Sequence, residues 1–209
     1  MSQMIQALER RMLMSVTVDT LTADMQTIKS DAAAVVAARI AMNKTVLADA
    51  RVIAAAVRQA ETKSNRPENT TLLAALLRDD NLNLAKIVYG VNGLNSSAKY
   101  SATSGAAFGK VLLKDPTSAA YQKYVAKIVT YATTVVPQWV TYVENQLTNF
   151  ANTVGSPLGL IANLNPTLAS AVNSYENDFG TRADALVTAS IQVQTDTTQL
   201  TSDLGAIPT

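Results

Sequence analysis

The chain has 209 residues, of which 48% are apolar and 16% charged, so its composition is that of a globular protein and not that of a disordered tail. Seventeen basic and sixteen acidic residues leave a net charge of +1, which implies no strongly charged partner. The absence of Cys and His excludes disulfides, thiolate nucleophiles, Ser-His and Cys-His dyads and the commonest metal ligands.

The composition favours long helices. Ala is the commonest residue with 33 copies, Thr follows with 24, and none of the 8 Gly and 6 Pro residues precedes Pro67. Ala has the highest helix propensity, and the scarcity of helix breakers allows helices to run long.

The first predicted helix covers residues 18–64, which contain no Gly or Pro, with Thr17 and Asp19 as candidate N-caps. A continuous helix here would be about 69 Å long, against a diameter of about 43 Å for a compact globule of this size. We therefore expect either a rod or a break, and the break is expected at residues 43–45, which are three poor-to-middling helix formers. The apolar heptad row of this segment is Leu21, Ile28, Val35 and Met42.

Residues 65–115 are predicted to form a loop-rich cap. A short helix is expected to begin at Pro67 and to end near Asp80, and a second is expected over residues 82–89. Half of all glycines follow, interspersed with serines, which indicates loops. Residues 108–113 are expected to form a short buried helix or strand. The glycines of this region are Gly90, Gly93, Gly105 and Gly109.

The next predicted helix extends from Pro116 to about Thr153 and contains Pro137. Because proline lacks an N–H and clashes with the preceding turn, we expect a kink there or a split at Val136. The β-branched residues of this segment also permit a strand. Two parallel apolar rows are spaced by seven, one of Val129, Val136, Val143 and Phe150 and one of Val125, Ala132 and Trp139.

A turn is predicted at residues 155–159, which contain two glycines and a proline. The last predicted helix extends from Thr167 to about Leu204, with Asn165 as its cap and Pro166 at its start. Its heptad row consists of Val172, Phe179, Leu186, Val193 and Leu200.

These segments predict an all-α fold, an elongated up-and-down bundle of three or four long helices with the spacing of a coiled coil. Residues 17–209 form the bundle, and residues 65–115 are its irregular helical insertion or cap. Residues 1–16 are a separate, targeting-like segment.

The amino terminus contains a recognisable pattern. Arg10 and Arg11 precede only three apolar residues, fewer than the roughly 7–15 of a secretory signal peptide. Residues 8–15 resemble the LEPR-XLL motif, a short N-terminal signature of large exported and surface proteins in one bacterial group. Arg10 stands where the motif has Pro, and Met14 where it has Leu. The matching positions are Leu8, Glu9, Arg11, Leu13 and Ser15.

This resemblance implies a bacterial protein that is exported or located at the cell surface. It covers eight residues and implies nothing about the helices. The alternative is that residues 8–15 form an amphipathic helical turn with solvated arginines, in a cytoplasmic protein.

Three patterns that suggest ligand chemistry do not complete a known site. Residues 105–110 read GAAFGK, but a phosphate-binding loop needs one more residue between the glycines and a Ser or Thr where Val111 stands. Residues 79–83 offer oxygen ligands without the Gly and distal Glu of a calcium loop. The carboxylates Glu144, Glu176 and Asp178 are too scattered to predict a pair, and a di-metal bundle site needs His. We predict no catalytic, cofactor-binding or metal-binding residue.

Surface and membrane patterns are equally unspecific. Lys44, Arg51 and Arg58 are seven apart, which predicts a solvated basic face, with anion binding as the alternative. Residues 128–143 carry no charge, but they are fewer than the roughly 20 of a membrane span. An aromatic cluster is interpreted as core packing, with an aromatic ligand site as the alternative. The cluster consists of Tyr121, Tyr124, Tyr131, Trp139 and Tyr142.

The sequence thus favours a non-enzymatic structural or protein-interaction module that binds a protein partner or itself through helix faces. Nucleic acid, cofactors and a membrane span are not expected. The first alternative is a bundle that binds a small apolar ligand between its helices, near Trp139 and Phe179. The second is an enzyme that uses only Tyr, Lys, Ser, Asp or Glu.

Overall fold

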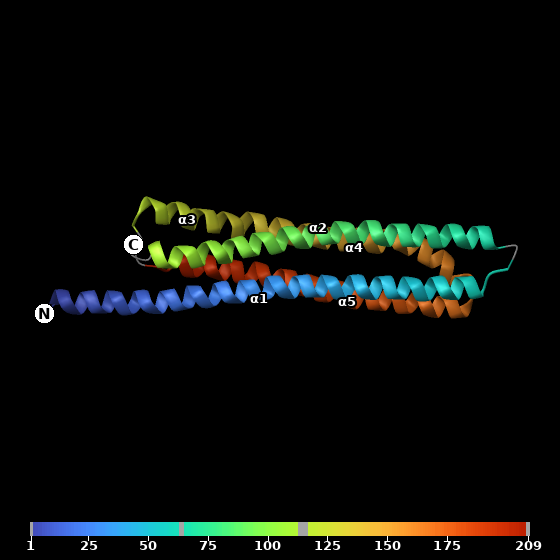
Figure 1. The fold of residues 1–209 in the computed structure, drawn as a ribbon, viewed down its shortest axis with the longest axis horizontal. Coiled ribbons are helices and arrows are strands. Elements are labelled where there is room, and N and C mark those ends of the chain that lie inside the picture. The colour runs from blue at the N-terminus through green and yellow to red at the C-terminus, as the bar shows by residue number, and fades with distance from the viewer. Residues whose placement is uncertain (1, 63–64, 113–116, 208–209) are drawn as a thin grey trace. The chain divides into compact units, whose positions relative to one another are not determined.

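The structure is a computed structural model that describes the backbone of residues 2–62, 65–112 and 117–207. Side chains are described over the same ranges except for residues 2–17 and 104–112. Helix makes up 94% of the described residues, and no strand occurs among them. The all-α fold class is therefore confirmed (Figure 1).

Four long helices are packed as an up-and-down bundle, in which each runs back along the one before it (Figure 1). The third of them is made of three elements that join without interruption, α3, the π-helix η1 and α4. The elements in the described part of the chain are α1 (Ser2–Gln59), α2 (Arg66–Leu112), α3 (Ala119–Thr130), η1 (Tyr131–Val135), α4 (Val136–Ala162) and α5 (Pro166–Gly205).

The chain divides into two compact units. Unit 1 comprises Met1–Ala34, Gly93–Val140 and Ala189–Thr209. Unit 2 comprises Val35–Asn92 and Thr141–Thr188. Each unit thus draws segments from α1, α2, α4 and α5, and unit 1 also contains α3 and η1.

Each unit has a core in which most residues of the predicted apolar rows are buried together with other apolar residues, while Val125, Val129 and Trp139 of those rows are only half-buried. In a helix, residues three and four apart share a face, so a row of this kind forms a buried stripe. Unit 1 buries Leu21, Ile28, Leu94, Ile128, Val136, Val193 and Leu200. Unit 2 buries Val35, Met42, Ile53, Leu76, Ile87, Val143, Phe150, Val172, Phe179 and Leu186.

The predicted break in the first helix is wrong, because α1 continues through residues 43–45. Met42 and Val46 on either side of this segment are fully buried, so the apolar stripe is not interrupted. Packing of that stripe outweighs the weak helix propensity of three residues. Thr17 and Asp19 are likewise interior positions of α1 and not caps.

The predicted loop-rich cap at residues 65–115 is also wrong, since residues 66–112 form the single helix α2. Gly90 and Gly93, which suggested loops, lie under aromatic rings. A Cβ atom at Gly93 would be 2.5 Å from the ring of Trp139, and one at Gly90 would be 2.6 Å from Tyr142 Cδ1. These glycines are therefore explained by close packing, not by turns. The side chains of residues 108–113 lie outside the described residues.

The helix that contains Pro137 is not split. Its proline cannot donate to the carbonyl four residues earlier. The preceding turn widens instead, and the N–H of Val136 donates to the carbonyl of Tyr131, five residues before it. This extra residue shifts the buried face, so that Val129 of the predicted row is only half-buried. The buried row through the wide turn is Ile128, Ala132, Val136 and Val140.

The predicted turn at residues 155–159 is absent, and α4 continues to Ala162 with Pro157 inside it. Burial of Val154, Leu158 and Ile161 contributes roughly 1.5–3 kcal/mol for each side chain. Together these contributions exceed the ~3 kcal/mol cost of an internal proline. The predicted cap of the last helix is confirmed. The N–H of Leu168 donates to Asn165 Oδ1 at 3.0 Å.

Candidate functional site

The residues predicted from the N-terminal motif cannot be placed as side chains. Leu8, Glu9, Arg11, Leu13 and Ser15 belong to the helical start of α1, and their side chains lie outside the described residues. The same holds for residues 105–110 of the GAAFGK segment, which lie within the helix α2.

Among the described residues, no cluster of three or more His, Cys, Asp or Glu side chains is arranged to hold a metal ion. The oxygen-rich residues 79–83, considered as calcium ligands, are interior positions of α2. Asp79 accepts a hydrogen bond from Arg78 Nε at 2.8 Å, and Asp80 lies in the core. In the searched part of the chain, no helix combines the length and apolar character that crossing a bilayer requires.

The basic row on α1 stays in solvent, as the sequence predicts. Lys44, Arg51 and Arg58 are all exposed. Both ion pairs found among the described residues, Arg66 with Glu61 and Arg78 with Asp79, lie elsewhere.

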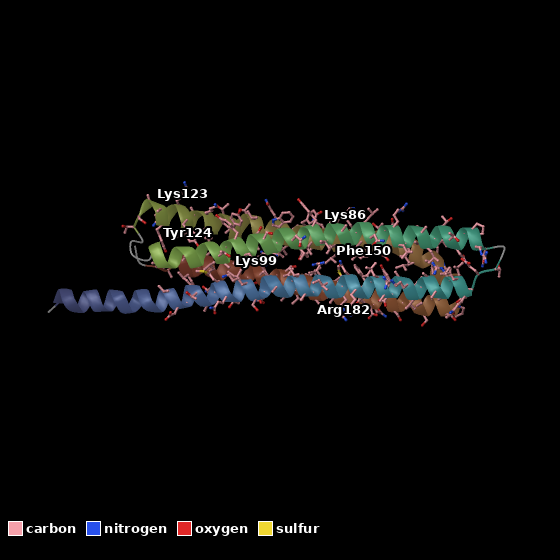
Figure 2. All side chains as sticks on the ribbon, viewed as in Figure 1. Lys86, Lys99, Lys123, Tyr124, Phe150 and Arg182 are labelled. Carbon is pink, nitrogen blue, oxygen red and sulfur yellow. The ribbon has the colours of Figure 1, made fainter. Side chains whose placement is uncertain are left out.

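Of the predicted aromatic cluster, Tyr121 is buried, and the other four side chains, those of Tyr124, Tyr131, Trp139 and Tyr142, are half-buried. In unit 1, Tyr100 of α2 stacks on Tyr131 with ring centroids 4.5 Å apart, and Lys127 Nζ lies 4.7 Å from the Tyr100 centroid. Burial raises the pKa of Tyr124, which lies on α3 (Figure 2). The sequence identified the tyrosines of the third helix but missed Tyr100, because a contact between two helices leaves no signal in a linear pattern.

A buried polar pair in unit 2 was not predicted. Tyr175 of α5 donates to Asp80 Oδ1 of α2 at 2.6 Å, and both side chains are almost completely buried. Burial raises the pKa of Asp80 to about 6, an effect that the hydrogen bond from Tyr175 opposes. Asp80 Oδ2 is buried without a hydrogen-bond partner. Burying this polar pair in the core therefore costs free energy. The sequence did not indicate it, because Asp80 was predicted to lie at the end of a helix.

A second unpredicted feature is a set of facing carboxyl groups between α1 and α5 in unit 1. Asp24 and Asp31 are seven apart on α1, and Asp196 and Asp203 are seven apart on α5. The carboxyl group of Asp24 faces that of Asp203, and the carboxyl group of Asp31 faces that of Asp196, and each contact raises the pKa of the α1 residue. The one feature of the sequence that could have indicated this set is the equal spacing of seven on both helices. The pairs themselves form only because α1 and α5 pack antiparallel in unit 1. We call these four residues the carboxyl seam.

The exposed apolar residues include one ordered row on α2 in unit 2. Leu82 and Tyr89 are seven apart and remain 55% and 62% exposed. The exposed Lys86 lies between them (Figure 2). The ring of Tyr89 packs edge-to-face on Tyr142 with centroids 5.8 Å apart, which holds it in place. We call Leu82, Lys86 and Tyr89 the α2 outer face.

No protein family, curated protein or solved structure matches this chain.

Proposed function

We propose that the protein is a non-enzymatic structural or interaction module that binds a protein partner, or a second copy of itself, through the outer faces of its helices. The observation that carries this proposal is the α2 outer face. Its two large apolar side chains are more than half exposed although they lie on a regular helix. Burying such side chains against a partner releases the free energy that drives association.

The chemistry of this face suits a protein partner. Tyr is enriched at the energetic centres of interfaces because its ring buries a large area with few rotatable bonds. Tyr89 is already oriented by Tyr142, so binding would cost little side-chain entropy. The face also has one positive charge, on Lys86, which favours a partner surface with an acidic residue opposite it.

The test compares two double variants in unit 2. Leu82→Ser/Tyr89→Ser removes the apolar part of the α2 outer face. Ile40→Ser/Val52→Ser removes side chains on α1 that are similarly exposed, at 52% and 58%. We expect cross-linking in the native cell and sedimentation of the purified chain to show loss of assembly in the first variant alone. Equal assembly in both variants would contradict the proposal.

We also propose that the protein is exported or associated with the cell surface, on the resemblance of residues 8–15 to the LEPR-XLL motif. Replacing Leu8, Arg11 and Leu13 by Ala in the native host should then move the protein into the cytoplasmic fraction. An unchanged distribution would favour the cytoplasmic alternative.

The small-ligand alternative depends on Trp139 and Phe179. Trp139 packs over Gly93 in unit 1. Phe179 packs edge-to-face on Phe150 in unit 2, with centroids 4.8 Å apart. In both of these contacts the ring packs against the protein itself, which supports core packing over a ligand site.

A further inference from the structure

Among the described side chains, no positive charge shifts the pKa of Asp24 or Asp31. The charged groups that act on Asp24 are Asp203 and Asp196, and the one that acts on Asp31 is Asp196. The lysines of unit 1 whose side chains are described are not among the causes of either pKa shift. They are all exposed, and they are Lys29 of α1, Lys99 of α2 and Lys123 and Lys127 of α3.

Two carboxyl groups can hydrogen-bond to each other only if one of them carries a proton, because ionised carboxylates are acceptors alone. If all four carboxyl groups are ionised, Asp24 Oδ2 and Asp196 Oδ2 are buried without a hydrogen-bond partner. A proton on one member of each pair supplies the missing donor. Without it, two negative charges face each other in a partly desolvated contact between helices.

The α5 side of the carboxyl seam is held in place by glutamines. Gln192 Nε2 donates to Asp196 Oδ1 at 3.0 Å. Gln199 Nε2 donates to both carboxyl oxygens of Asp203 at 3.1 Å. The same Gln–Asp spacing of four thus occurs twice, seven residues apart, which fixes both carboxyl groups on the same helix face.

We propose that the carboxyl seam is a proton-operated clasp, which fastens the C-terminal part of α5 to α1 in unit 1 at mildly acidic pH and loosens it at neutral pH. The contact is made by shared protons between Asp24 and Asp203 and between Asp31 and Asp196. Loss of these protons replaces two hydrogen bonds by charge repulsion at the same positions. The other contacts of α5 in this unit include the buried Val193, Leu200 and Leu204 and the hydrogen bond that Tyr121 of α3 donates to the carbonyl of Leu204 at 3.5 Å. None of these groups changes its charge between pH 4 and pH 8.

The pKa values of Asp24 and Asp31 give the direction of the pH effect and the pH range in which it occurs. The pKa of Asp24 rises from 3.8 to about 6, through burial first and then through Asp203. The pKa of Asp31 rises from 3.8 to about 6, through the hydrogen bond with Asp196 first and then through burial. Because the folded state binds these protons more tightly than the unfolded state, the stabilisation is complete below pH 3.8 and is lost as the pH rises through 6.

The experiment is hydrogen exchange of the amides at residues 193–203, expressed as protection factors at pH 4.5 and pH 7.5. Both shifted groups are partly exposed, so we allow for solvent screening and expect the wild-type protection to be at least about tenfold higher at pH 4.5. The variant Asp24→Asn/Asp31→Asn keeps the shape of both side chains without their charge. Its protection factors should be nearly equal at the two pH values.

Three further variants separate this clasp from other causes. Asp196→Asn/Asp203→Asn should also abolish the pH dependence, and it replaces the first variant if that one does not fold. Asp19→Asn/Asp184→Asn removes two exposed carboxyl groups, which gives the same change in net charge, and should keep the wild-type dependence. Asp80→Asn, in unit 2, should also keep the wild-type pH dependence of the protection factors.

Equal protection of the wild-type chain at both pH values would overturn the proposal. So would a wild-type response in Asp24→Asn/Asp31→Asn, or loss of the response in Asp19→Asn/Asp184→Asn.

Discussion

Replacing Gly90 by Ala tests whether close packing explains the glycines of α2. In an exposed helix, Ala is more stable than Gly by about 1 kcal/mol. At Gly90, however, the new Cβ would lie 2.6 Å from Tyr142 Cδ1 and 3.0 Å from Val143 Cγ2. Both distances are shorter than a normal carbon–carbon contact, and overpacking of this kind costs about 1–3 kcal/mol. We expect a net loss of stability of up to about 2 kcal/mol.

Gly180 in the same unit is the matched control. It lies inside α5, and nothing is within 4 Å of a Cβ placed there. Gly180→Ala should therefore show the helix propensity gain alone, and the two variants should differ by about 1–3 kcal/mol, the overpacking cost. Urea unfolding followed by circular dichroism measures both free energies. If Gly90→Ala is as stable as Gly180→Ala, the contact with Tyr142 does not explain why Gly stands at position 90.

Three more predictions concern the core, the amino terminus and the buried carboxyl group. Leu186 is completely buried, so Leu186→Ala should lower the free energy of unfolding by about 2–5 kcal/mol, while Arg51→Ala on the exposed basic row should lower it by less than about 0.5 kcal/mol. Urea titration of both variants measures this contrast, and a larger loss at Arg51 would indicate that the basic row is an interface or a buried site. Deletion of residues 1–16 should change the free energy of unfolding by less than about 1 kcal/mol, because the start of α1 projects past the other helical segments of unit 1 (Figure 1). A larger loss would mean that this segment is packed. The pKa of Asp80 is raised from 3.8 to about 6, so its contribution to stability is complete below pH 3.8 and falls by up to about 3 kcal/mol as the pH rises through 6. Asp80→Asn should remove that part of the pH dependence of thermal unfolding, and an unchanged dependence would contradict the assignment.

The apolar rows were the most reliable guide to the fold. Spacing by three and four residues identifies the buried face of a helix without knowledge of its neighbours, because the period belongs to the helix itself. Ile28 and Met42 on α1 and Leu186 and Val193 on α5 were placed correctly for this reason. The cap at Asn165 was also predictable, since a cap is formed by residues three apart along the chain.

Predictions of helix ends failed where a helix breaker is compensated by a neighbouring helix. In the sequence alone Gly93 indicates a loop. In the structure the ring of Trp139 packs directly against Gly93, where a side chain would not fit. Pro157 suggested a turn because its local cost is visible in the sequence, whereas the burial of Leu158 and Ile161 depends on their partners. The wide turn before Pro137 belongs to the same class, since it lets the buried residues Ile128 and Ala132 before it and Val136 and Val140 after it face the core of unit 1 together.

The sequence by itself determined that the chain is helical, that most residues of the heptad rows face inward and that no Cys or His chemistry is available, because these properties follow from residue type and helix period. The tertiary structure alone decided which polar residues meet. Asp24 and Asp203 are far apart in the chain, as are Asp80 and Tyr175, and each pair exists only because antiparallel helices pack in one particular register. Register depends on the fit of whole helix faces and not on any local pattern, so the carboxyl seam and the buried pair emerge only when the helices are brought together.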